Sequence, residues 1–131
     1  MEIKLKVLPR KDPRDLTQPE RFYVKAVKTG NCNLERLAYL ISNQSTVREP
    51  DCLAVLNAFV HNMLDELGQG RVVELGDLGN FQVGVRSHGS DTPEEVNLTN
   101  IKNVVLNYRP SSKIKKRLKT MNFSIQGAQT P

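Results

Sequence analysis

The stretch GRVVELGDLGNFQV, residues 70–83, constrains the fold more than any other part of this chain. It follows a long amphipathic segment, and its valines and leucine favour a short strand. The next five residues, GDLGN, supply glycine and asparagine, which tolerate left-handed backbone. Apolar residues then alternate from Phe81 to Val85, as in a strand with one buried face. The sequence therefore predicts two strands and a glycine-bounded turn directly after a helix.

Two helices are predicted before this hairpin. Either Asn31 or Asn33 can cap a short first helix, whose apolar residues recur at helical spacing. Thr46 and Glu49 have the spacing of a capping box, in which each side chain bonds a backbone N–H of the other residue. We therefore expect the second helix to begin there and to end near Leu67, where glycines follow.

The apolar band of the second helix is too wide for a helix with one small neighbour. In a chain of 131 residues this band would stay partly in water, and large exposed apolar patches usually mark an interface. We therefore expect a dimer, although the N-terminal segment could cover the band instead. The expected dimer core is Leu53, Leu56, Phe59, Val60, Met63 and Phe81.

Further strands and a helix are predicted at the two ends of the chain. Residues 3–7 alternate apolar side chains with lysines, and residues 21–27 also read as a strand, so the two could form a hairpin or join another sheet. A polar, turn-rich stretch follows Val85 and leads to a strand at residues 101–108. Pro110 and Ser111 then open a lysine-rich helix, and the residues beyond Ile125 read as an unstructured tail.

Positive charge is concentrated at both ends of the sequence. The net charge is +4 over residues 1–28, −5 over residues 29–108 and +6 over residues 109–131, which gives +5 for the whole chain. A basic balance favours polyanionic partners.

Catalytic, metal and membrane functions find little support in the sequence. Cys32 and Cys52 lack CxxC spacing, so we expect reduced, packed thiols. His61 and His88 stand without a metal-ligand partner at the required spacing, and no phosphate-binding glycine motif occurs. No apolar run approaches the ~20 residues of a membrane span, and no signal peptide is evident. These patterns predict a cytoplasmic protein that is not an enzyme and uses no cofactor, metal or small-molecule substrate.

From about residue 33 to residue 119 the chain resembles the bacterial HU and integration host factor family of histone-like proteins. The resemblance rests on the short helix LERLAYLIS, the long helix with Phe59 in its apolar band, and the stretch GRVVELGDLGNF at residues 70–81. An arm, the sequence Tyr108-Arg109-Pro110 and the lysine-rich helix follow in the family's order.

The resemblance implies an α+β fold and an intertwined dimer. Helices would form its base, and a three-stranded sheet from each subunit would form a saddle that extends into two arms. The arms of the family reach into the minor groove of duplex DNA, where an apolar tip residue kinks the duplex. We expect residues 1–30 to form a β-rich N-terminal extension, residues 31–122 the HU-like domain and residues 123–131 a flexible tail.

The resemblance also implies DNA-contacting residues on the saddle and its flanks, where cations meet phosphates. Pro93 lies near the expected arm tip and is the candidate wedge residue, whereas the alternative is that residues 92–95 form a simple turn. The predicted DNA contacts are Arg71, Arg86, Lys102, Arg109, Lys113, Lys115, Lys116, Arg117 and Lys119.

The predicted arm departs from the family pattern because it carries Asp91, Glu94 and Glu95 where family arms are rich in arginine and lysine. The leading hypothesis is a nucleoid-associated homodimer, or heterodimer, that binds duplex DNA with low sequence specificity and bends or compacts it. The alternative is an HU-fold dimeric scaffold or protein-interaction module with weak or no DNA binding. A third possibility is that the N-terminal extension covers the saddle and blocks DNA.

Overall fold

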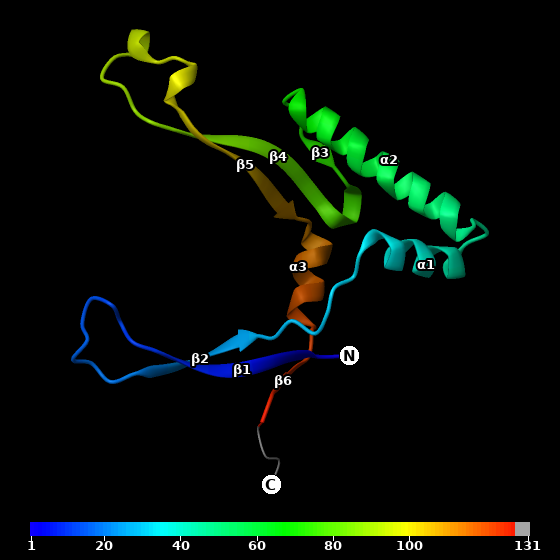
Figure 1. The fold of residues 1–131 in the computed structure, drawn as a ribbon, viewed down its shortest axis with the longest axis horizontal. Helices are drawn as coiled ribbons and strands as arrows, with labels where there is room; N and C mark the ends of the chain where they lie inside the picture. The colour runs from blue at the N-terminus through cyan, green and yellow to red at the C-terminus, as the bar shows by residue number, and fades with distance from the viewer. Residues whose placement is uncertain (128–131) are drawn as a thin grey trace. The chain divides into compact units, whose positions relative to one another are not determined.

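The computed structural model describes residues 1–127, which divide into two compact units. One unit contains residues 1–32 together with the chain from Arg117 onward, and the other contains residues 33–116. Each unit has its own three-stranded sheet (Figure 1).

The first unit is built on the strand order β2-β1-β6. Strand β1 (Ile3–Arg10) pairs antiparallel with β2 (Arg21–Ala26), as the hairpin alternative predicted. Strand β6 (Phe123–Ile125) pairs parallel with β1 on its other side. The register places Leu5 opposite both Ala26 and Ile125.

Strand β6 lies in the segment that the sequence analysis assigned to a flexible tail. The amide of Gln126 donates to the carbonyl of Leu5 (2.7 Å), and the amide of Ile3 donates to the carbonyl of Asn122 (2.8 Å). The chain is therefore ordered through these residues, because β1 satisfies their backbone groups. The last four residues of the expected tail lie outside the described residues, and the domain limits drawn from the sequence stay a prediction.

The second unit begins with helices α1 (Leu34–Gln44) and α2 (Glu49–Gly68). Asn33 caps α1, since its side chain accepts a hydrogen bond from the amide of Arg36 (2.9 Å). The expected capping box of Thr46 and Glu49 is wrong. Arg48 is the N-cap residue of α2 and Pro50 lies in the first turn, so Thr46 lies outside the helix and cannot serve its free amides.

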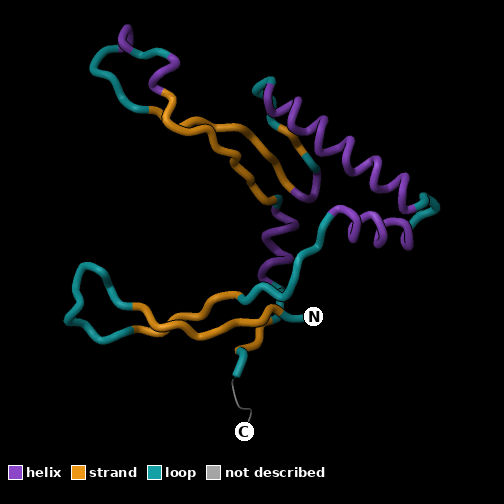
Figure 2. Tube along the Cα trace, viewed as in Figure 1, coloured by secondary structure: helices purple, strands orange, loops and turns teal. Residues whose placement is uncertain are grey.

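The second sheet has the order β3-β4-β5, all antiparallel. Strand β3 is short, and the turn that follows it forms a short 3₁₀-helix, η1. Gly76 in this helix has a positive φ of 57°. Beyond the long strands, two more 3₁₀ turns, η2 and η3, form the outer part of the arm (Figure 2). The elements are β3 (Val73–Glu74), η1 (Gly76–Leu78), β4 (Gly79–Ser87), η2 (Pro93–Glu95), η3 (Leu98–Asn100), β5 (Ile101–Pro110) and α3 (Ser112–Lys119).

Very little of the described chain is buried. Only Ala38, Cys52, Leu67 and Gly79 are buried among residues 1–127, and Phe59 remains 43% exposed. The accessible surface is 11493 Å², whereas a compact monomer of this mass would expose about 7,000 Å² and two separate compact units about 8,300 Å². A single chain therefore leaves its apolar side chains without enough protein to cover them.

The two cysteines differ in environment. Cys52 is buried in α2, as expected. Cys32 is exposed, contrary to the expectation of a packed thiol, because it lies in the irregular segment between β2 and α1.

Candidate nucleic-acid interface

The sheet β3-β4-β5 has one polar and one apolar face. Paired residues of antiparallel strands share a face, so the register sorts the side chains. Phe81 lies opposite Tyr108 on the apolar face, and their rings stack with centroids 4.7 Å apart. We call the other side the polar sheet face; its residues on β4 and β5 include Asn80, Gln82, Arg86, Asn103, Asn107 and Arg109.

The polar sheet face carries two of the predicted DNA contacts. Arg86 pairs with Asn103 near the arm, and Arg109 pairs with Asn80 at the other end. Arg109, Asn107 and Gln82 also border a shallow hollow of about 230 Å³. Guanidinium and carboxamide groups can donate to phosphate oxygens or to base edges.

Two other features modify this face. Glu74 of β3 lies opposite Asn80 and adds an acid at its edge. Lys102 falls at a register shift between β4 and β5, because Arg86 pairs with Asn103 whereas Ser87 pairs with Ile101. Such an irregularity leaves one residue unpaired and increases the local twist at the base of the arm.

The glycine-bounded turn holds the start of α3. The hydroxyl of Tyr108 donates to the carbonyl of Leu78 (2.7 Å), and the hydroxyl of Ser111 donates to the carbonyl of Asp77. The ammonium of Lys113 lies 2.9 Å from the Asp77 carboxylate. The glycine-bounded turn therefore positions the start of the lysine-rich helix at the end of β5.

The cations of α3 do not form one equivalent set. At about 100° of rotation per residue, Lys116 and Lys119 lie opposite the apolar pair Ile114 and Leu118, and Lys115 lies to one side of it. All three lysines are exposed. Lys113 instead pairs with Asp77, so part of its charge is already balanced.

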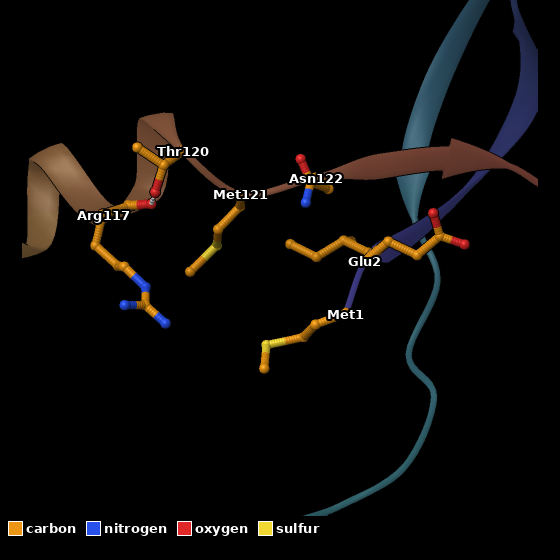
Figure 3. Close-up of a pocket in the computed structure, with 7 residues that line it drawn as sticks. Met1, Glu2, Arg117, Thr120, Met121 and Asn122 are labelled. Atoms are coloured by element: carbon orange, nitrogen blue, oxygen red, sulfur yellow. Dashed lines mark hydrogen bonds between the residues drawn. The ribbon is translucent and has the colours of Figure 1, made fainter.

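Arg117 has a different environment. The division between the two units falls inside α3, after Lys116, and Arg117 belongs to the unit of the N-terminal sheet. There it lines a mostly apolar hollow of about 340 Å³ with Met1 and Met121 (Figure 3).

Arg71, a further predicted DNA contact, lies 2.6 Å from the carboxylate of Glu66 on α2.

Asn100 connects the two sides of the arm through hydrogen bonds of its side chain. Its side-chain amide donates to the carbonyl of His88 (3.0 Å) and to the hydroxyl of Ser90 (2.8 Å), and its oxygen accepts from the amide of Asn97 (3.0 Å). Pro93 is exposed and begins η2, within the segment that the alternative reading took for a turn.

Two groups of residues at this site were not predicted from the sequence. Leu98, at 84% exposure, is the most exposed large apolar side chain of the arm. The carboxamides Gln82, Asn103 and Asn107 were not considered, although alternation along β4 and β5 would have placed them with Arg86 and Arg109. The DNA contacts were predicted from positive charge, and apolar and amide side chains carry none.

Other kinds of site find no support among the described residues. Within residues 1–127, no three His, Cys, Asp or Glu side chains gather closely enough to hold a metal ion. None of the helices in this part of the chain is both long and apolar enough to cross a bilayer.

Comparison with solved structures identifies the fold. A proposed bacterial DNA-binding protein from Bacteroides vulgatus superposes with a TM-score of 0.65 at 12% identity, over 98% of this chain and 50% of that protein. The HU protein of an Anabaena HU–DNA cocrystal superposes with a TM-score of 0.54 at 18% identity, over 68% of this chain and 99% of that HU. The fold is therefore of the HU type, as the resemblance implied.

The sequence model of one family, "HU domain fused to wHTH, Ig, or Glycine-rich motif", matches residues 1–125. The chain belongs to this family, known as HU-HIG. The match includes the N-terminal sheet, so those strands are part of the family pattern. The chain spans half the length of the Bacteroides vulgatus protein, and no curated protein matches its sequence significantly.

Proposed function

We propose that this chain is a dimeric histone-like protein that binds duplex DNA with low sequence specificity and bends or compacts it in the bacterial nucleoid. The observation that carries the proposal is the two-sided sheet, whose exposed polar face holds Arg86 and Arg109. Strand β5, which contains Arg109, leads directly into α3 and its lysines. The Anabaena HU, which shares the fold, was crystallised with DNA. The proposal assigns the chain no catalytic activity.

Low specificity follows from the chemistry of these residues. Lysines recognise phosphates, which are the same at every base step, so these contacts carry no sequence information. Two unrelated duplexes of equal length should therefore bind with affinities within about tenfold of each other, since phosphate contacts carry no sequence information.

The test is fluorescence anisotropy with a labelled duplex over a salt series. We expect the triple variant K115Q/K116Q/K119Q to lower the slope of log affinity against log salt by about 2 to 3, because each lost phosphate contact removes about 0.9. A duplex labelled at both ends should report shortening by energy transfer when the wild-type protein bends it.

The control R36Q/R48Q/K28Q removes the same charge from positions outside the polar sheet face and α3. Equal losses in the triple variant and the control would show general electrostatics and not a contact surface. Absence of wild-type binding at ~50 mM salt, where phosphate contacts are strong, would reject the proposal.

A second function, a dimeric scaffold that binds another protein, is favoured by the arm. Its acids Asp91, Glu94 and Glu95 are accompanied by the exposed apolar residues Val96 and Leu98. Acidic groups repel a phosphate backbone, whereas exposed apolar side chains suit a protein partner.

A further inference from the structure

The N-terminal sheet also has two unlike faces. The register places Leu5 opposite Ala26 and Val7 opposite Val24, so one face is apolar throughout. The other face holds cations and no acid from the strands β1, β2 and β6, and we call it the cationic face. It consists of Lys4, Lys6, Arg10, Arg21 and Lys25, with Leu8, Tyr23 and Ser124.

Like charges face each other directly across the β1–β2 ladder. Lys6 lies opposite Lys25, and Arg10 lies opposite Arg21. Directly opposed like charges destabilise a sheet, so these pairs weaken the hairpin in the absence of a counter-charge. A solvated face that served only solubility would mix both signs. The arrangement therefore fits an anionic ligand that lies over the sheet.

Local acids do not neutralise these four cations. Glu2, just before β1, bonds the Lys4 ammonium at 2.8 Å, and that hydrogen bond lowers the pKa of the Glu2 carboxyl. Glu2 thus balances Lys4 alone. In the β1–β2 loop, the carboxylates of Asp12 and Asp15 accept from the amides of Arg14 and Thr17.

An open space adjoins the arginine pair. Arg10, Lys11, Arg21 and Tyr23 border a polar hollow of about 390 Å³, to which Asp12 also contributes. Arginine guanidinium groups bind phosphate through paired N–H donors. Lys6 lies four residues from Arg10 along β1, about 13 Å at 3.3 Å per residue, so the two opposed pairs can meet different phosphates.

We propose that the cationic face of the N-terminal sheet is a second DNA-contacting surface, which binds the phosphate backbone of duplex DNA through Lys6, Arg10, Arg21 and Lys25. This inference rests on the proposed function, since it adds a surface to a chain that binds duplex DNA. The ligand lies over Leu8 and Tyr23, between the two cation pairs, and compensates their repulsion.

The test uses the full chain with the quadruple variant K6Q/R10Q/R21Q/K25Q. We expect the slope of log affinity for duplex DNA against log salt to fall by about 2 to 4, and the affinity at about 100 mM salt to fall at least tenfold. The variant R14Q/K28Q/R36Q/R48Q removes the same charge from outside the cationic face and should lose much less affinity.

Thermal unfolding supplies an independent measurement. Because the quadruple variant removes two opposed like-charge pairs, its melting temperature without DNA should equal or exceed that of the wild type. Weaker DNA binding by a chain that is at least as stable would identify a ligand-binding role. A lower melting temperature together with unchanged DNA affinity would show that the cations serve the fold and would overturn the inference.

The outcomes separate this inference from the proposed function. If wild-type protein fails to bind DNA at all, the proposed function itself fails. If the wild type binds and K115Q/K116Q/K119Q weakens binding while the quadruple variant does not, only the second surface is rejected. Loss of binding to vesicles of anionic lipid, with DNA affinity unchanged, would assign the cationic face to a membrane surface and also overturn the inference.

Discussion

Gly79 lies where the turn after β3 meets the end of β5. Its φ of 122° is outside the range that side-chain-bearing residues readily adopt. A Cβ at this position would lie 2.1 Å from the carbonyl oxygen of Arg109 and 3.0 Å from the amide of Ser111. The absence of a side chain thus lets the turn approach the residues that begin α3, and the contacts of Asp77 and Leu78 depend on that approach.

Gly79→Ala should lower the free energy of unfolding by about 2–4 kcal/mol, because backbone strain and overpacking add at this site. Chemical denaturation followed by circular dichroism measures the change. Gly30→Ala is the control, since nothing lies within 4 Å of a Cβ there; it should shift stability by no more than about 0.5 kcal/mol. Equal stability of the two variants would show that the close approach at Gly79 is unimportant.

Elements defined by local patterns could be predicted from the sequence, whereas those that depend on distant partners could not. The helices, the glycine-bounded turn and the strands of the β3-β4-β5 sheet follow from periodicity and turn residues. Strand β6 has three residues and forms only because β1 lies beside it. The ion pair of Lys113 with Asp77 likewise joins residues far apart in sequence. The sequence alone therefore could not distinguish Lys113, which has an acidic partner, from Lys115.

The arm is the element in which charge and family pattern disagree. If the arm follows DNA, its three acids lie near phosphates and weaken binding. The variant D91N/E94Q/E95Q should then raise the affinity for duplex DNA several-fold in anisotropy measurements at low salt, with a smaller gain at high salt as repulsion is screened.

Removing three acids elsewhere, as in E20Q/E35Q/D65N, controls for the change in net charge and should raise the affinity less. If the arm variant and the control respond alike, the arm does not lie near DNA. That result would favour the scaffold function and leave the exposed Leu98 for a protein partner.

At the scale of the whole molecule, the excess of exposed surface points to association. The apolar face of β4 and β5 remains open, with Val104 66% exposed, and Phe59 and Val60 of α2 are also more than one-third exposed. Leu53, Leu56, Met63 and Phe81 are only partly buried. A second copy that covers these residues would complete a core that one chain leaves unfinished, as we propose for the dimer.

Phe59→Asp should convert the proposed dimer to monomer, because a charge buried in an apolar interface is costly. Sedimentation velocity at micromolar concentration measures the mass. Ala54→Asp places the same charge at an exposed position about 140° around α2 from Phe59, and should leave the dimer intact. A wild-type chain that sediments as a monomer would contradict the dimer proposal.

The parallel pairing of β6 with β1 has a consequence for how the chain folds. The first sheet joins Ile3 to Phe123, so it can be completed only after residues 123–125 have been synthesised. Contacts of such large sequence separation form slowly, because the intervening chain must first be ordered or looped out. Until then β1 has an open edge that other chains can pair with. A nascent or truncated chain that lacks residues 123–125 is therefore the form of this protein most prone to aggregate.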